Sequence, residues 1–289
     1  MSSPATPAEA ATVAVLTIAH GRHDHLSTQV AGLGRGQRLP DLHVVVAMDD
    51  PDLTAGRVPL GDGRWQTVVD SVDVVGGELP LAAARNRAAS VASGAGADVL
   101  VFLDVDCVPG PGTVEEYAAA VTAGGRPVPA VFVGDVAYLP PAPEGGYPLE
   151  GLAALGEHRP GRPVLPPGRT RPEPDLTAFW SLSFAMSVTD WHTAGGFCED
   201  YVGYGGEDTD FGQVVGAAGG SLTWVGGATA YHQHHGGPTH WAAQREAIVR
   251  NANLFHDRWG WFPMQGWLER FAAEGLARLD PASGRWVLV

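Results

Sequence analysis

The sequence contains no lysine, and all 18 of the residues counted as Lys or Arg are arginine. This absence excludes catalysis through a lysine Schiff base, and it excludes the lysine of a phosphate-binding P-loop. Together with the abundance of Ala, Gly and Pro, the arginine-only usage indicates a compositional bias of the source rather than a functional choice.

Basic residues are also few beside the 32 acidic ones, so the formal net charge is −14 at pH 7. Phosphate binding by nucleic-acid proteins requires a basic surface, and we therefore expect no nucleic-acid partner. The acidic balance is still compatible with a nucleotide that is held through a metal ion.

Cysteine and long apolar runs are scarce as well. Cys107 and Cys198 form neither a CxxC motif nor a set of bridges, which favours a reducing, cytoplasmic setting. The N-terminus lacks the basic region of a signal peptide, and no apolar run reaches the roughly 18 residues that span a bilayer. We expect a cytoplasmic protein without a transmembrane segment. The sequence is also compatible with peripheral association with a membrane.

Alternating strand and helix patterns predict an α/β fold. Predicted strands cover residues 12–19, 43–48, 65–75, 99–106, 130–136, 178–188 and 221–225. Predicted helices cover residues 26–33, 79–92, 114–121, a short helix that begins at 189–192 and ends at Gly195-Gly196, the stretch from the Gly205 region to about 218, 241–257 and 268–279. The strand–helix–strand start implies right-handed crossovers and a parallel sheet. Residues 139–174 are crowded with Pro, Gly and Arg and are expected to form a long loop, either a lid or a linker.

One apolar run ends in two closely spaced acids. The five residues of 99–103 lead directly into Asp104 and Asp106, at the sheet edge where α/β folds place their ligands. Residues one apart face opposite ways in a strand, so the two acids act together only if the chain leaves strand geometry there. The Pro- and Gly-rich segment 108–112 supplies that break. The pattern indicates a divalent-cation site, and an acidic surface turn is the alternative.

Polar residues also follow the first two strands and a predicted helix. His20, His23 and His25 form a loop that we expect to contact a ligand rather than to bind a metal. Asp49 or Asp50 is placed to bond a ribose or base, or else to cap a turn. In the helix, Arg85 or Arg87 could reach a pyrophosphate, and a solvated helix face is the alternative.

A second acidic stretch, Gly-Gly-Glu-Asp-Thr-Asp-Phe, covers residues 205–211. Its glycines allow close backbone approach, and acids in a first helical turn complement the helix dipole. Capping accounts for one acid but not for three. Further on, His232 and His234 share one side of an extended segment, and either could complete a two-carboxylate metal site.

These stretches resemble a known family. The Asp-x-Asp strand end, preceded by a helix with Ala-Arg-Asn-Arg-Ala, resembles the nucleotide-sugar half of a family 2 glycosyltransferase of GT-A fold. Residues 194–210 resemble the galactosyltransferase-type C-terminal GGED motif, found also in polypeptide N-acetylgalactosaminyltransferases. The resemblance covers about residues 12–240. It implies a Rossmann-like mixed, mainly parallel sheet flanked by helices, with a flexible tail (1–10), a nucleotide-sugar half (11–136) and an acceptor half (137–289).

The resemblance also implies a ligand set for Mn²⁺ or Mg²⁺. Asp106 would bind the metal most directly, and Asp104 would hold the ribose or assist the metal. His232 would be the further ligand, and His234 or His235 could substitute for it. The chain departs from the family here, because galactosyltransferases carry Met and His where this sequence has Tyr-His-Gln-His-His.

Catalytic and donor-binding roles follow from the same resemblance. Asp208 would be the general base that gives inversion at the anomeric carbon, and Glu207 would orient the acceptor. The implied donor contacts are Thr17, Ala19, Arg22, Asp49, Arg85, Asp104, Val105 and Tyr204.

The resemblance thus implies a metal-dependent inverting hexosyltransferase that uses a nucleotide-diphosphate sugar, with UDP as the expected nucleotide, and a carbohydrate or other hydroxyl-bearing acceptor. One alternative is a metal-dependent nucleotidyltransferase. The His-rich loop after the first strand disfavours it, because that class uses a Gly-rich loop with Lys or Arg. The other alternative is a non-catalytic nucleotide-sugar-binding protein.

Overall fold

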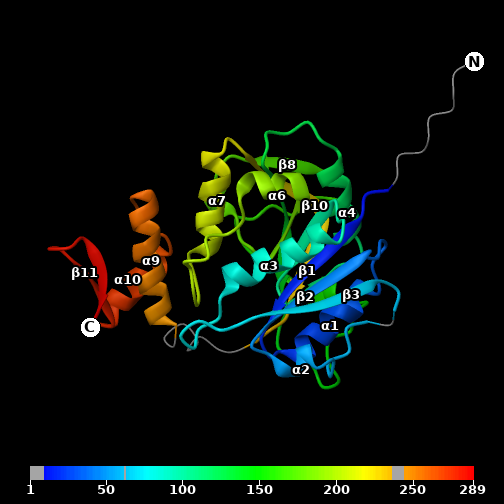
Figure 1. Ribbon diagram of the computed structural model, residues 1–289, viewed down its shortest axis with the longest axis horizontal. Helices are drawn as coiled ribbons and strands as arrows, with labels where there is room; N and C mark the ends of the chain where they lie inside the picture. The colour runs from blue at the N-terminus through cyan, green and yellow to red at the C-terminus, as the bar shows by residue number, and fades with distance from the viewer. Residues whose placement is uncertain (1–9, 62, 236–243) are drawn as a thin grey trace, which may run out of the picture.

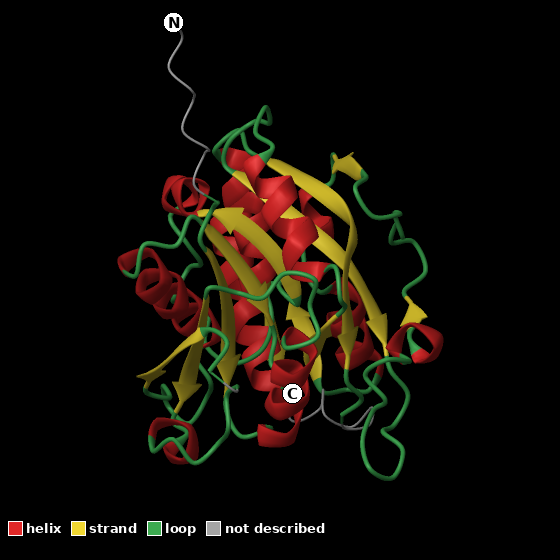
Figure 2. Cartoon of the chain, turned by 90° about the vertical axis from the view of Figure 1, so that its right-hand side faces the viewer, coloured by secondary structure: helices red, strands yellow, loops and turns green. Residues whose placement is uncertain are grey.

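The computed structural model describes residues 10–61, 63–235 and 244–289. A ten-stranded mixed sheet forms its centre, with the strand order β3-β2-β1-β4-β9-β6-β10-β5 and with β7 and β8 paired to β6 and β10 (Figures 1 and 2). Most of the predicted N-terminal tail, residues 1–9, lies outside the described residues. The α/β class and the mainly parallel sheet are as predicted.

The first half of the sheet is parallel. Its strands are β1 (Val13–Ala19), β2 (Leu42–Met48), β3 (Gln66–Val72) and β4 (Val99–Leu103). β1, β2 and β4 are buried along their whole length, as their continuous apolar runs require in a sheet that is covered on both faces.

The second half of the sheet is mixed. Its strands are β5 (Cys107–Pro109), β6 (Ala130–Tyr138), β7 (Glu157–His158), β8 (Thr170–Glu173), β9 (Ser183–Ser187) and β10 (Ser221–His232). β9 runs antiparallel between β4 and β6, whereas β10 runs parallel to β6. This arrangement brings the ends of β4, β6 and β10 to one region of the sheet.

Helices cover both faces of the sheet. The helices of the described chain are α1 (His23–Leu33), α2 (Pro51–Thr54), α3 (Leu81–Gly94), α4 (Thr113–Thr122), α5 (Leu152–Leu155), η1 (Leu176–Ala178), α6 (Val188–Ala194), α7 (Glu207–Ala217), α9 (Arg245–Trp259) and α10 (Gln265–Ala273). Side chains of α1 and α4 share one buried cluster with one face of the sheet. Those of α3, α6 and α7 share another, in which the rings of Phe102 and Phe184 stack 4.3 Å apart.

The C-terminal segment forms a small layer beside α7 (Figure 1). α9, α10 and a hairpin of β11 (Ala277–Asp280) and β12 (Arg285–Leu288) enclose their own cluster, which includes Ile248 and Phe271. The fully buried Asp210 of α7 fixes this layer, because its Oδ1 accepts bonds from Arg258 Nε and Trp259 Nε1, both at 2.7 Å.

Two sequence predictions concern this C-terminal layer. The helix predicted over 268–279 was wrong at its end, since the chain turns at Gly275 and pairs as a hairpin, and the first three residues of the helix predicted over 241–257 lie outside the described residues.

Three other predictions are corrected by long-range pairing. Residues 139–174 are not a continuous loop, because they contain α5, β7 and β8, and β8 pairs with β10. β9 begins at Ser183 rather than at residue 178, and β10 continues to His232 rather than stopping at 225. Within the described part of the chain, no helix is long and apolar enough to cross a membrane.

Candidate functional site

A tight turn follows β4 and carries both aspartates of the Asp-x-Asp stretch. The chain leaves strand geometry after Leu103, and Cys107 N donates to Asp104 O at 2.8 Å before β5 begins. The buried Gln29 of α1 holds the turn, because its Nε2 donates to the carbonyl oxygens of Asp104 (2.7 Å) and Cys107 (3.1 Å). The chain does leave strand geometry at the two aspartates, but the predicted position of the break was wrong: the strand ends at Leu103 rather than at Asp106, and residues 108 and 109 belong to β5. A side chain from another element fixes the turn.

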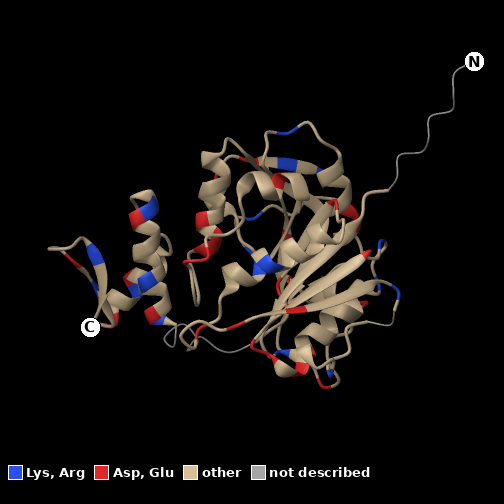
Figure 3. Cartoon of the chain, in the orientation of Figure 1, with Lys and Arg blue, Asp and Glu red and all other residues tan. Residues whose placement is uncertain are grey.

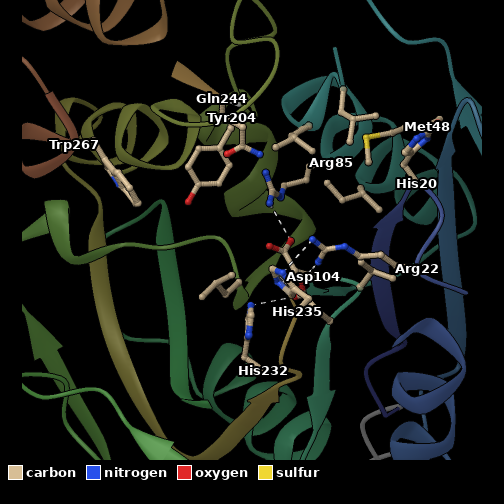
Figure 4. A pocket seen from close by; sticks show the side chains of 16 residues that line it. His20, Arg22, Met48, Arg85, Asp104, Tyr204, His232, His235, Gln244 and Trp267 are labelled. Carbon is tan, nitrogen blue, oxygen red and sulfur yellow. Dashed lines mark hydrogen bonds and ion pairs between the residues drawn. The ribbon is translucent and has the colours of Figure 1, made fainter. Parts of the chain in front are cut away.

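Two histidines lie beside Asp106: His232 at the end of β10, and His235 three residues later. Figure 4 labels both histidines. His235 Nε2 lies 3.0 Å from Asp106 Oδ2, and His232 Nε2 lies 3.6 Å from Oδ1. One ligand atom from each of the three residues falls within 4.8 Å of the others. Asp106 Oδ1 is buried and has no hydrogen-bond partner, since 3.6 Å is too long for one. Two imidazole nitrogens and a carboxylate oxygen form a donor set that suits a divalent transition metal such as Mn²⁺.

Positive groups surround Asp106. Arg22, which has a left-handed backbone at φ 52°, forms an ion pair with Asp106 and also approaches His235 Nδ1 at 3.3 Å. Burial would raise the pKa of Asp106, but the bond from His235 and the charges of His232 and Arg22 lower it to about 2. Asp106 is consequently ionised over the whole physiological pH range, as a metal ligand requires.

Arg85 of α3 joins the Asp-x-Asp turn to α7. Its guanidinium is almost fully buried, donates to Asp104 Oδ1 at 2.9 Å and donates to Glu207 Oε1 at 3.3 Å. Burial alone would lower the pKa of Arg85, and the charges of Asp104 and Glu207 raise it. One cation thereby compensates two carboxylates from distant parts of the chain. Figure 3 marks the basic residues of α3 in blue and the acidic first turn of α7 in red.

The first turn of α7 carries two carboxylates with raised proton affinity. Gly205 and Gly206 precede it with φ values of 95° and 93°, a conformation that only glycine adopts without strain. Burial, followed by the charge of Asp208, raises the pKa of Glu207 to about 7. Burial also raises the pKa of Asp208, whose Oδ1 accepts a bond from Thr209 N at 2.7 Å. A carboxylate whose pKa is raised toward neutrality is suited to general-base work.

A pocket of about 560 Å³ opens above the turn. The sheet side contributes Ile18, His20 and Met48, and Arg85 and the Asp-x-Asp turn contribute its floor. Tyr204, Gln244 and Trp267 close the opposite side, as Figure 4 shows. Glu207 and Asp208 are not among the described residues that line this space, and Arg85, which lines it, connects the pocket to Glu207.

The structure brings together most of the residues singled out from the sequence. Those that line the pocket are Arg22, Arg85, Asp104, Val105, Asp106, Tyr204 and His232. His234 lies outside the cluster, since its side chain is exposed and its backbone N–H donates to the Tyr147 hydroxyl; His235 takes the place beside Asp106. The sequence interpretation had left His235 as a substitute because the register at the end of β10 was open.

Three of the residues that were expected to contact the donor lie away from the pocket. Thr17 and Ala19 are buried on the α1 side of β1, where Thr17 Oγ1 donates to Gln29 at 2.9 Å. Asp49 is exposed, with φ 49°. Its neighbour Asp50 is buried instead, caps α2 and accepts bonds from Gly21 N and His23.

Sequence reasoning missed several residues that line the pocket. They are Ile18, Met48, Leu79, Leu81, Leu182, Gln244 and Trp267. Strand alternation was the available signal for Ile18, because residue 17 faces α1 and residue 18 must then face the other way. No local signal marked Gln244 or Trp267, which reach the pocket from the C-terminal layer.

Comparison with known proteins gives relatives by sequence. Residues 170–236 match the family model described as the N-terminal domain of galactosyltransferase. Validoxylamine A glucosyltransferase of Streptomyces hygroscopicus subsp. limoneus is 28% identical over 228 residues, which cover 73% of this chain and 49% of the relative. The enzyme of the same name from S. hygroscopicus subsp. jinggangensis (strain 5008) is 32% identical over 158 residues, which cover 50% of this chain and 36% of the relative. The chain thus spans half or less of the length of these relatives.

Comparison of structures gives the fold. The crystal structure of GalNAc-T7 with UDP, GalNAc and Mn²⁺ superposes with a TM-score of 0.55 at 15% identity, covering 92% of this chain and 57% of that one. The chain has a GT-A type fold, as the sequence predicted, and its relatives by sequence are glycosyltransferases.

Proposed function

We propose that this protein is a metal-dependent, inverting glycosyltransferase that moves a sugar from a nucleotide-diphosphate sugar, with UDP as the nucleotide, to an acceptor hydroxyl. The observation that carries the proposal is the convergence of Asp106, His232 and His235 beside a pocket whose floor is linked through Arg85 to the carboxylates of α7. A GT-A type fold and glycosyltransferase relatives support the same class of chemistry.

In this proposal, Asp106, His232 and His235 hold Mn²⁺ or Mg²⁺. The fit rests on the orphaned Oδ1 of Asp106 and on three donor atoms within 4.8 Å of one another. A divalent cation there would neutralise the charge that develops on the leaving nucleoside diphosphate. Asp104, which Arg85 already holds, assists the metal or binds the ribose, and Mn²⁺ beside UDP in GalNAc-T7 supports this choice of ion.

The remaining roles fall to side chains of the pocket and of α7. Arg22 and Arg85 bind the donor's phosphates, while Val105 and Tyr204 contact the donor. Asp208 takes the proton of the acceptor hydroxyl as that oxygen attacks C1 from the face opposite the leaving group, which inverts the anomeric carbon. Glu207 orients the acceptor by hydrogen bonding. Residues 11–136 and 137–289 are accordingly proposed as the nucleotide-sugar half and the acceptor half.

Donor turnover without acceptor tests this function. The full chain is incubated with UDP-, GDP- and TDP-sugars and Mn²⁺, with EDTA as the control, and the products are separated by chromatography and mass spectrometry. We expect slow release of UDP and free sugar from one UDP-sugar, abolished by EDTA. Release of a nucleoside monophosphate or of a sugar 1-phosphate would indicate nucleotidyl transfer instead, and calorimetric binding without turnover would indicate a binding protein.

A further inference from the structure

Two arginines between β7 and β8 lie over one tryptophan. The guanidinium carbon of Arg162 is 3.5 Å from the ring centroid of Trp180, and that of Arg159 is 4.4 Å away. Arg162 also approaches the Trp224 ring at 5.3 Å. Stacking of this kind fixes the plane of a guanidinium and leaves the N–H groups along its edge to form hydrogen bonds. Arg162 uses one of them for the Ala178 carbonyl oxygen, and Arg159 is hydrogen-bonded to the Tyr138 side chain.

Neither arginine forms an ion pair within the described residues, although most other arginines there do. Arg162 donates to the carbonyl oxygen of Ala178 at 2.9 Å. The carboxylates whose charges reach it are Asp208 and Asp135, and Asp135 is already bonded to His158 at 2.5 Å. Burial lowers the pKa of Arg162 to about 10, so the side chain still carries its full charge at pH 7. The chain therefore holds a half-buried cation without a close counter-ion.

This pair lies next to the candidate site. The ring of Tyr138, at the end of β6, is 5.0 Å from the ring of His232, and the charge of Arg159 acts on Tyr138. On the other side, the charge of Asp208 acts on Arg162. The pair is therefore connected to the proposed metal ligands through Tyr138 and interacts electrostatically with the proposed base, and neither arginine lines the pocket that would take the donor.

We propose that Arg159, Arg162 and Trp180 form the subsite that selects the acceptor, and that the acceptor carries an oxyanion, either a carboxylate or a phosphate monoester, besides its reacting hydroxyl. The inference rests on the proposed function and names the substrate class of the same site. Guanidinium groups bind carboxylate and phosphate in a two-pronged geometry, and both neighbouring guanidiniums repel a cationic acceptor. The anion would hold the acceptor with its hydroxyl toward Asp208.

Direct binding tests the subsite without turnover. Calorimetry measures the affinity of glucose, glucosamine, glucuronate and glucose 6-phosphate for the full chain with Mn²⁺ and UDP. We expect at least one of the two anionic sugars to bind about 10-fold or more tightly than glucose, and glucosamine to bind no better than glucose. The anionic sugar that binds more tightly identifies the group as carboxylate or phosphate. The double variant Arg159→Gln/Arg162→Gln should abolish the difference, whereas Arg171→Gln, on the same segment but paired with Glu173, should keep it.

Equal affinity for all four sugars, or a preference that survives the double variant, would overturn the subsite. Donor hydrolysis by the double variant is measured in parallel and should stay within about 2-fold of the parent chain, since neither arginine lines the donor pocket. If the parent chain hydrolyses no donor, the proposed function fails instead. Failure of the subsite and failure of the proposed function are therefore distinguished by different measurements.

Discussion

The two acidic centres of this protein have opposite protonation behaviour, although both are buried. Asp106 lies beside two histidines and Arg22. The hydrogen bond from His235 and the favourable electrostatic interactions with His232 and Arg22 outweigh burial and lower the pKa of Asp106 to about 2. Glu207 and Asp208 repel each other and share Arg85 with Asp104, so burial dominates and their pKa values rise. The difference shows that the partners brought in by other elements decide the protonation of a carboxylate, because Asp106 and Glu207 are both buried carboxylates.

Removing the ionised carboxylate of Asp106 should have the largest effect on activity. Asp106→Asn takes the only carboxylate from the candidate ligand cluster and should reduce donor hydrolysis and transfer by about 1,000-fold or more, since several kcal/mol of charge stabilisation depend on the ion. Mn²⁺ binding, followed by electron paramagnetic resonance, should be lost in parallel. His234→Ala is the control, because that exposed histidine lies outside the cluster. Equal loss in both variants would contradict the ligand assignment.

Removal of the proton acceptor should have the next largest effect. Asp208→Asn should slow sugar transfer by roughly 100-fold to 10,000-fold, the range for loss of a general base, while the donor's dissociation constant changes by no more than about 2-fold. Transfer rates and calorimetric donor affinity measure the two quantities. Asp200→Asn, an exposed acid on the loop before α7, should leave both unchanged. If Asp208→Asn transfers sugar at the parent rate, the base assignment fails.

A smaller effect should come from loosening the turn that presents Asp106. Gln29→Leu removes the side-chain donor to the carbonyl oxygens of Asp104 and Cys107, although Asp104 O keeps its bond from Cys107 N. We expect Mn²⁺ affinity to fall about 10-fold and the free energy of unfolding to fall by about 1–3 kcal/mol. Metal titration and urea unfolding check the two expectations, with Gln37→Leu, exposed after α1, as the matched control. Unchanged affinity would mean that the turn holds its shape without Gln29.

The last expected effect concerns stability alone and depends on pH. The pKa of Glu207 rises from 4.5 to about 7 on folding, so the folded chain binds more protons than the unfolded chain between these values. Stability should therefore fall as pH rises from about 4.5 to about 7, by at most roughly 3 kcal/mol. Glu207→Gln should flatten this slope in urea unfolding, whereas Glu115→Gln, which changes an exposed acid in the first turn of α4, should not. A slope that is unchanged by Glu207→Gln would indicate that another group causes it.

The sequence predicted most reliably those features that local patterns encode. β1, β2 and β4 are continuous apolar runs, and the turn after β4 follows from two acids ahead of a Pro- and Gly-rich segment. The first turn of α7, with its two glycines and three acids, was likewise visible. Pairing between distant segments was not visible in the sequence. β8, for example, is short, and only its pairing with β10 defines it as a strand.

The sequence does not show which of two neighbouring residues faces the site, because that depends on the local backbone geometry. Asp49 has a left-handed backbone that turns the next residue, Asp50, inward, and no pattern distinguishes two adjacent aspartates. Similarly, Thr17 contacts α1 while Ile18 lines the pocket, because successive side chains of a strand point to opposite faces of the sheet. Gln244 and Trp267 come from a layer whose position depends on the bonds of Asp210, and those bonds join residues 48 and 49 positions apart.

Arg85 has a consequence for the engineering of this protein. Chimeric enzymes are commonly designed by exchanging sequence halves, and residue 136 would be a natural crossover point here. However, the guanidinium of Arg85 is bonded to Asp104 on one side of that point and to Glu207, 122 positions from Arg85, on the other. A graft that brings a new second half without a carboxylate at position 207 would bury an under-compensated cation, and one without Arg85 would bury two unpaired acids. These three residues should therefore be transplanted as a unit.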